Sequence, residues 1–462
     1  MLGKRTSRVL CAALLFSAWA GASARAETSV FDHFALIDGT GRASQPDSAM
    51  VVTDGRISWI GPASQLKSPA GSAITDLKGS FVIPGLIDNH IHLAIVDGLH
   101  QDIKYYTLPN IQGQLRTYAA YGVTAVQILG TDKDSIFPFR ESQRAGRPDM
   151  ARVFTAGQGI VYKNSYGGVV GLNQPVSNAA EAVKEVDKQA AKGVDVIKLW
   201  VDDELGSFPA RMPADVSKAV IEEAHRKHLK AIAHVFYLEN AKTLIAQGVD
   251  GFAHEVRDQP IDQSLIDGMK ARNVWQMAAT LSREDSFTYT KLPFLDDPFF
   301  YRAVAPDLIA GLSDPKRQST LATAPSFPKY GVSFTNAMNN FGREAKAGVK
   351  YGMGTDSGPP GRLPGYSVHW ELELMVQSGL TPLQAITAAT GSNASFMGAK
   401  DIGTLERAKW GDFVILKKDP SADIKNTRSI QEVYIAGRKV PSIWSLCVDR
   451  AQTACRGGPD RS

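Results

Sequence analysis

The chain has 462 residues, of which 44% are hydrophobic, so it can bury a large core and is long enough for two or three domains or one large barrel. Its formal net charge of +4 comes from 51 basic and 47 acidic residues, and the first 26 residues contain four of the basic ones and no acid. Without them the charge is balanced, which excludes a basic nucleic-acid-binding protein.

The first 26 residues have the features of an export signal. Basic residues (Lys4, Arg5 and Arg8) precede an apolar stretch at 9–20, and an Ala-Arg-Ala sequence at 24–26 suits a cleavage site. The apolar stretch is too short to span a bilayer comfortably, and no later segment is apolar enough to do so. We therefore expect a cleaved signal and a periplasmic or secreted protein without membrane contact.

Residues 29–75 contain short β-rich runs, two of which flank Asp54-Gly55, a strong hairpin signal. A similar pattern returns at 411–416 and 433–440. Because the two ends share this pattern around a different middle, we expect one small β-sandwich domain formed by residues 27–80 and 397–445, with 446–462 as a C-terminal tail.

Residues 81–396 alternate apolar strand candidates with amphipathic helical patterns. Eight such units predict an α/β fold of the (β/α)₈ TIM barrel type, in which residues at the C-terminal strand ends carry the chemistry. A doubly wound open sheet is the alternative, but it would not explain why polar residues cluster at those ends. The strand candidates are 81–87, 123–129, 152–156, 194–200, 231–235, 251–254, 274–278 and 349–354.

His90 and His92 follow the first strand candidate, after a Pro-Gly pair. Side chains at i and i+2 of a strand point to the same side, so both imidazoles can reach one metal ion. Two histidines on a solvated strand face are the alternative. The preceding apolar run and the further candidate ligands downstream favour the metal site.

Four more polar residues lie at predicted strand ends: Lys198, His234, His254 and Asp356. An ammonium group cannot bind a metal, and such a lysine normally reaches water or an ion pair. Burial can lower the pKa of a lysine, however. The neutral amine can then add CO₂ and form a carbamate whose two oxygens bridge two cations.

These motifs resemble those of the metal-dependent amidohydrolase superfamily. Residues 84–93 resemble its first-strand motif, 354–358 its eighth-strand motif, and 403–415 the return of the chain to the β domain. Residues 197–198 and 371–382 resemble the imidazolonepropionase-like and prolidase-like branch.

The resemblance implies a binuclear hydrolase that cleaves amide or peptide C–N bonds of dipeptides or N-acyl amino acids by metal-activated hydroxide. Its cofactors would be two divalent ions, which we expect to be zinc, and an N6-carboxylated Lys198. One ion would be bound by His90, His92, Lys198 and Asp356, and the other by Lys198, His234 and His254. Asp356 would also be the catalytic proton acceptor.

A substrate with a free carboxylate would need a cation or a tyrosine, and our candidates are Tyr237, then Tyr166 and His369. A lactonase or phosphotriesterase, a mononuclear deaminase or cyclic-amide hydrolase, and an inactive exported binding protein stay open as alternatives. Lys198 argues against the mononuclear enzyme, and the complete set of ligands argues against the inactive protein.

Three further features complete the expectations. The aromatic-rich stretch at 281–340 is either a lid or packing against the barrel. Cys447 and Cys455 remain after the signal leaves with Cys11, and we expect them to form a disulfide. The partner is a small-molecule substrate rather than nucleic acid, and a homo-oligomer stays open.

Overall fold

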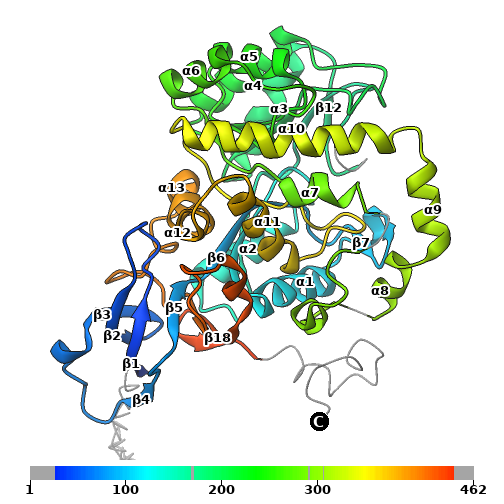
Figure 1. The fold of residues 1–462 in the computed structure, drawn as a ribbon. Helices are drawn as coiled ribbons and strands as arrows, with labels where there is room; N and C mark the ends of the chain where they lie inside the picture. Colours follow the sequence, from blue (N-terminus) through cyan, green and yellow to red (C-terminus); the bar gives the residue numbers. More distant parts are fainter. Residues whose placement is uncertain (1–26, 168–170, 290–291, 305, 442–462) are drawn as a thin grey trace, which may run out of the picture.

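Figure 1 shows the computed structural model, which describes residues 27–167, 171–289, 292–304 and 306–441. The predicted signal at 1–26 and the predicted Cys447–Cys455 disulfide lie outside the described residues. Among the helices of the described ranges, none combines the length and apolar character needed to cross a membrane.

Strands from both ends of the described chain form one sheet, in the order β19-β18-β17-β5-β1-β2-β3, with β4 beside β1 (Figure 1). The predicted sandwich is therefore a single hydrogen-bonded sheet. Phe31 of β1 lies 5.0 Å from Phe413 and 5.1 Å from Tyr434, measured between ring centroids, and these rings belong to one hydrophobic cluster of this sheet. Its strands are β1 (Thr28–Leu36), β2 (Gln45–Thr53), β3 (Arg56–Pro62), β4 (Ala73–Asp76), β5 (Phe81–Pro84), β17 (Phe413–Leu416), β18 (Ile430–Ile435) and β19 (Arg438–Lys439).

The strand predicted at 81–87 is in fact divided between two sheets. β5 pairs with β1 and β17 in the small sheet, whereas β6 (Leu86–Ile91) pairs in parallel with β9 (Val123–Ile128). The division falls at Gly85, where an added Cβ would lie 2.0 Å from Oγ1 of Thr124. Glycine is needed there because β9 passes so close to the backbone.

Parallel strands form the middle of the molecule in two sheets, with the orders β10-β9-β6 and β12-β11-β13-β14-β15-β16. The backbone N–H of Asp195 donates to the carbonyl of Thr155 at 2.8 Å and links the two sheets. The remaining strands are β10 (Arg152–Thr155), β11 (Ile160–Tyr162), β12 (Gln174–Val176), β13 (Ile197–Trp200), β14 (Ala231–His234), β15 (Gly251–Phe252) and β16 (Trp275–Gln276), with a separate hairpin of β7 (Val96–Asp97) and β8 (His100–Gln101).

The eighth strand predicted at 349–354 is reduced to single parallel bridges, from Tyr351 to Gln276 and from Ser357 to Ile91. The side chain of Asn393 explains part of this irregularity. Its amide accepts from the backbone N–H of Met353 at 3.0 Å and donates to the Met353 carbonyl at 2.7 Å. The Asn393 side chain thus takes up the Met353 N–H, while the Met353 carbonyl also accepts from the backbone N–H of Asn89 in β6 at 3.1 Å.

The helices lie outside the parallel strands, and α3 to α6 cover β11 to β15 through a shared hydrophobic core (Figure 1). The 281–340 stretch is largely helical, and its Phe294 and Phe300 pack against Tyr121 and Tyr366, which supports the packing interpretation. The helices are α1 (Leu108–Ala120), α2 (Ile136–Ala145), α3 (Ala179–Ala191), α4 (Ala214–Arg226), α5 (Leu238–Gln247), α6 (Gln263–Arg272), α7 (Leu281–Ser286), α8 (Pro306–Leu312), α9 (Pro315–Thr323), α10 (Phe327–Lys346), α11 (Tyr366–Gln377), α12 (Pro382–Thr387) and α13 (Asn393–Met397).

Candidate metal centre

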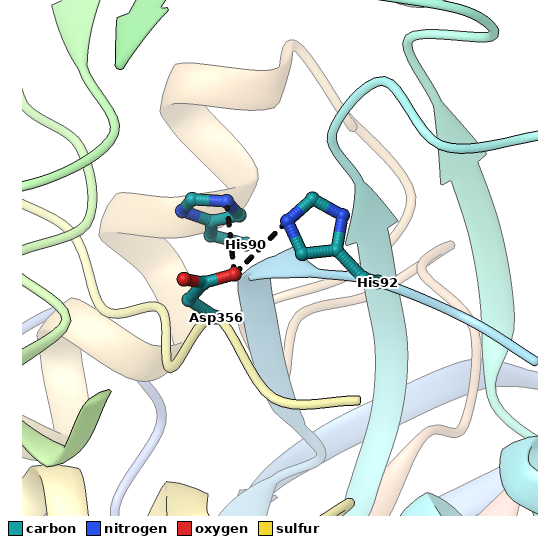
Figure 2. A group of neighbouring side chains, drawn as sticks. All are labelled: His90, His92 and Asp356. Carbon is teal, nitrogen blue, oxygen red and sulfur yellow. Dashed lines mark ion pairs between the residues drawn. The ribbon is translucent and has the colours of Figure 1, made fainter. Parts of the chain in front are cut away.

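His90, His92 and Asp356 form the first group of potential metal ligands (Figure 2). His90 lies in β6 and His92 directly follows that strand, so both rings reach the same side as the sequence pattern predicts. Oδ1 of Asp356 lies 3.6 Å from Nε2 of His90 and 2.9 Å from Nε2 of His92. All three side chains are buried.

The other ring nitrogen of each histidine is occupied. Nδ1 of His90 donates to the carbonyl of Ala253 at 3.0 Å, and Nδ1 of His92 is hydrogen-bonded to Oγ1 of Thr131 at 2.8 Å. Burial lowers the pKa of both imidazoles, which favours their neutral form. Because the Ala253 carbonyl can only accept, the proton of neutral His90 lies on Nδ1 and its Nε2 carries a lone pair. Metal-binding histidines are commonly oriented in this way.

Asp356 presents one oxygen to these histidines and the other to arginines. Oδ2 is ion-paired with Nε of Arg283 at 2.7 Å and also with Arg362. Burial alone would raise the pKa of Asp356, but Arg362 and the neighbouring histidines hold it well below its usual range. Its backbone has a φ of 54°, a strained conformation of the kind that gathers at functional sites.

Asp202, Glu204 and His234 form a second group. Nε2 of His234 lies 3.2 Å from Oδ2 of Asp202 and 3.4 Å from Oε2 of Glu204. His254 lies between the two groups, because its ring centroid is 4.2 Å from that of His234 and 4.8 Å from that of His90. The two groups are therefore neighbours.

Lys198 lies on β13 with a side chain that is buried and an Nζ that has no hydrogen-bond partner among the described residues. Burial lowers the pKa of Lys198 to about 7, although the charges of Asp356 and Asp202 act in the opposite direction. The lowered pKa therefore favours the neutral amine of Lys198 near neutral pH.

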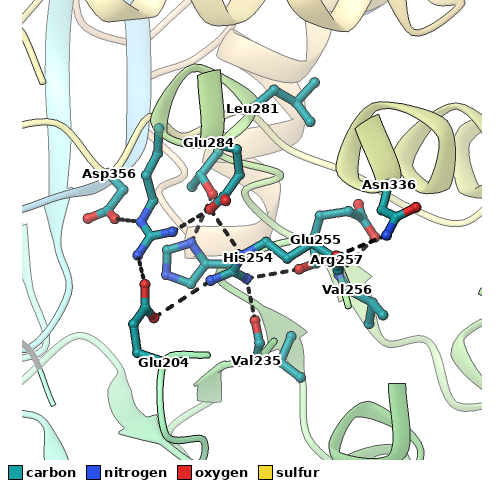
Figure 3. Close-up of polar contacts among 12 residues, drawn as sticks. Glu204, Val235, His254, Glu255, Val256, Arg257, Leu281, Glu284, Asn336 and Asp356 are labelled. Carbon is teal, nitrogen blue, oxygen red and sulfur yellow. Dashed lines mark hydrogen bonds and ion pairs between the residues drawn. The ribbon is translucent and has the colours of Figure 1, made fainter. Parts of the chain in front are cut away.

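Two buried arginines, Arg283 and Arg257, balance the carboxylates around these groups, and Figure 3 shows Arg257 beside Glu204 and Glu284. Arg283 of α7 donates to Oε1 of Glu204 at 2.8 Å and is ion-paired with Glu284. Nε of Arg257 lies 3.0 Å from Oε1 of Glu284, and its Nη1 donates to the Val235 carbonyl at 2.6 Å. Burial would raise the pKa of Glu204, but Arg283, His234 and Arg257 lower it, so Glu204 is a carboxylate.

The three predicted substrate contacts have different outcomes. The ring of Tyr166 lies 5.0 Å from that of His234, beside the second group. The Tyr237 hydroxyl instead donates to Oδ1 of Asp203 at 2.7 Å. His369 is buried in α11 with Nε2 donating to the Tyr121 carbonyl at 2.9 Å, so its ring is engaged in packing, and its predicted substrate contact stays a prediction.

Sequence reasoning missed Asp202 and Glu204 as candidate ligands, and Arg283 as their counter-charge. The signal for the first two was the run of three acids at 202–204, just beyond the fourth predicted strand. Arg283 lies in the stretch that was interpreted from its aromatic residues, so no pattern pointed to it.

Both the sequence and the fold of this chain are similar to those of known proteins. A sequence model described as the Amidohydrolase family matches residues 81–440. An uncharacterized protein of Mycobacterium tuberculosis is 25% identical over 221 residues, which cover 47% of this chain and 54% of that protein, so the match spans about half the length of this relative. An imidazolonepropionase of Deinococcus deserti is 24% identical over 410 residues, which cover 85% of this chain and 92% of the relative.

Among solved structures, a Xaa-Pro dipeptidase with bound methionine in its active site is similar to this chain with a TM-score of 0.71. The two sequences are 20% identical, and the match covers 89% of this chain and 99% of the dipeptidase. This likeness shows a shared fold, with parallel strands and a small β domain.

Proposed function

This chain belongs to the amidohydrolase family, in its imidazolonepropionase-like and prolidase-like branch, and from that premise we propose that it is a binuclear metal-dependent hydrolase of amide or peptide C–N bonds. Its substrates are dipeptides or N-acyl amino acids, and its two divalent ions are zinc. The same family membership supports a closed (β/α)₈ barrel, in which residues 351–357 join β16 to β6 through their two parallel bridges.

The observation that carries this proposal is the arrangement of unpaired donor atoms in the two groups. Nε2 of His90, Oδ1 of Asp356 and Nε2 of His234 are all buried without a hydrogen-bond partner in the described part of the chain. Buried polar atoms normally have partners, and leaving them unpaired is costly. Divalent ions would satisfy these atoms, because they take neutral imidazole and carboxylate as ligands.

Lys198 fits the role of a bridge between the two ions. Its unpaired Nζ, its burial and its lowered pKa supply the neutral amine that must attack CO₂. The alternative is an ammonium paired with an acid after the strand. It has less support, since neither Asp202 nor Asp203 forms an ion pair with Lys198, and the salt bridge of Asp203 is to Arg211.

Asp356 is the proton acceptor in this proposal. Two bound ions would polarise the scissile carbonyl and lower the pKa of a water molecule. Arg283 and Arg362 orient the Asp356 carboxylate, and its low pKa keeps it ionised before the reaction. A proton taken up by Asp356 is held weakly, so it can pass to the leaving amine.

The carboxylate of the substrate needs a partner other than Tyr237, whose hydroxyl is engaged by Asp203. Arg362 is the better candidate, because its side chain is 13% exposed and lies against Asp356. Tyr166 lies beside His234 and can contact the other part of the substrate.

A substrate screen tests the activity. Purified protein loaded with zinc should hydrolyse dipeptides or N-acyl amino acids with a higher kcat/KM than an imidazolone ring, lactones or aryl phosphates. A preference of a hundredfold or more for lactones or phosphotriesters would overturn the C–N assignment and leave the metal site standing.

The location of the protein is a separate part of this proposal. We infer export, cleavage after residue 26 and a Cys447–Cys455 disulfide from the sequence. Cell fractionation, N-terminal sequencing and thiol labelling of the mature protein test these points, and an intact N-terminus on cytoplasmic protein would contradict them.

A further inference from the structure

We propose that Asp202 and Glu204 are metal ligands, and that they hold the second ion together with His234. This inference rests on the proposed function and deepens it, because the ligands expected from the resemblance at that position were Lys198, His234 and His254. The second metal ion would then have two carboxylate ligands, Asp202 and Glu204, that the first ion lacks.

The spacing of the donor atoms suits one shared ion. Nε2 of His234 lies 3.2 Å from Oδ2 of Asp202 and 3.4 Å from Oε2 of Glu204. Ligands bound to zinc at about 2.0–2.2 Å in tetrahedral geometry lie roughly 3.3–3.6 Å apart. The corresponding separations in the first group, 3.6 and 2.9 Å, are similar.

Each carboxylate of this group has one fixed oxygen and one free oxygen. Oδ1 of Asp202 accepts from the backbone N–H of Glu204 at 3.0 Å, and Oε1 of Glu204 accepts from Arg283 at 2.8 Å. The remaining oxygens, Oδ2 of Asp202 and Oε2 of Glu204, have no hydrogen-bond partner in the described ranges, and neither does Nε2 of His234. Asp356 has the same division, with Oδ2 on arginines and Oδ1 free.

Ion pairing with arginine does not account for the whole group. Glu204 has Arg283 and Arg257 as counter-charges, but the described ion pairs of Asp202 include no arginine or lysine. Its side chain is nevertheless fully buried, with 0% exposure. A buried carboxylate without a compensating cation is strongly unfavourable, whereas a divalent ion between Asp202, Glu204 and His234 removes that cost.

The donor sets of the two positions also differ in kind. The first group offers two imidazoles and one carboxylate, and the second offers one imidazole and two carboxylates. Oxygen ligands favour harder cations such as Mn²⁺. The second position should therefore accept Mn²⁺ in place of Zn²⁺ more readily than the first.

Metal stoichiometry tests the inference without an activity assay. Metal-stripped full-length mature protein is dialysed against Zn²⁺, or separately Mn²⁺, and its metal content and affinities are measured by plasma mass spectrometry and calorimetry. Wild type should hold two ions per chain. Asp202→Asn and Glu204→Gln should hold one, or bind the second at least tenfold more weakly.

Asp203→Asn is the matched control, because it removes the same charge from the same loop. Its carboxylate points to Tyr237 and Arg211 rather than to His234, so this variant should keep both ions. Cooperative unfolding shows that a variant is folded. If Glu204→Gln does not unfold cooperatively, the metal content of Asp202→Asn alone tests the inference, because this substitution breaks no ion pair with arginine. Two ions of unchanged affinity in Asp202→Asn would overturn the inference and leave the proposed function intact. Wild type that binds no ion would overturn both.

Discussion

Arg283 should stabilise the metal-free protein by acting as its internal cation. The guanidinium reaches Glu204 at 2.8 Å and Asp356 at 2.7 Å, and it also contacts Glu284. Its side chain is only 2% exposed. The substitution Arg283→Met removes the positive charge but keeps much of the apolar volume of the side chain. The buried carboxylates of Glu204, Asp356 and Glu284 then lose one counter-charge.

The size of the effect follows from these contacts. Removing one partner of a buried ion pair costs about 3–5 kcal/mol. Unfolding entropy of about 2.1 cal/mol/K per residue gives roughly 1 kcal/mol/K for a chain of this length, so the Tm of the metal-free variant should fall by about 3–5 °C. Bound ions would supply the missing positive charge. If Arg283→Met binds each ion tenfold more tightly than wild type does, the bound ion restores about 1.4 kcal/mol of the lost free energy of unfolding.

Scanning calorimetry of metal-stripped and zinc-loaded samples measures both effects. Zinc should raise the Tm of Arg283→Met more than that of wild type. Arg362→Met is the control. The Arg362 side chain is more exposed than that of Arg283 and, among the acids that the structure describes, is ion-paired with Asp356 alone, so the Tm of this variant should fall less. An equal loss of Tm with and without zinc would refute the view that Arg283 and the ions balance the same carboxylates.

Three further substitutions test separate parts of the account. Lys198→Ala should lower kcat at least a hundredfold, because it removes the bridging ligand. Added short carboxylic acids should restore part of the lost kcat. An unchanged kcat would exclude Lys198 as a bridge. Tyr237→Phe should change KM for carboxylate substrates less than about twofold, since its hydroxyl binds Asp203; a tenfold rise would show that Tyr237 contacts substrate. Burial raises the pKa of the neighbouring Glu344 and Glu255, so this pair retains a proton in the folded state above the usual range of a carboxyl group, and the folded state loses stability as the pH rises. Glutamine at position 344 has no titrating carboxyl group. The Tm of Glu344→Gln relative to wild type should therefore be higher at pH 8 than at pH 5. The same difference in Tm at both pH values would contradict the raised pKa.

The proximity of His90, His92 and Asp356 could be predicted because it follows from local rules. Alternation along a strand places residues 90 and 92 on one side, and parallel strands collect their C-terminal residues at one end. The same reasoning brought Lys198 and His254 to this end of the strands. What these residues bind stays a prediction that metal analysis must test.

The second carboxylate group could not be predicted in this way. Glu204 lies in an irregular segment after β13 with a φ of 46°, a left-handed conformation that no periodic pattern indicates. Its orientation depends on Arg283, which is far away in the sequence. His369 was selected because it lies near the loop after the eighth strand, but sequence position alone does not show that its ring nitrogens are hydrogen-bonded to Thr427 and Tyr121.

The division of the first strand at Gly85 was also beyond local reasoning. The run at 81–87 is uniformly apolar because both of its halves are buried, in different sheets. Only the close approach of Thr124 reveals where one sheet ends and the other begins.

Metal analysis coupled to turnover tests the central claim most directly. Purified mature protein is assayed against a dipeptide or N-acyl amino acid before metal removal, after complete removal, and during stepwise addition of Zn²⁺. The account predicts close to two ions per chain at the start, loss of turnover on removal, and full recovery only when the second equivalent has been bound. Full activity in the thoroughly stripped protein, or full recovery at one equivalent, would contradict it.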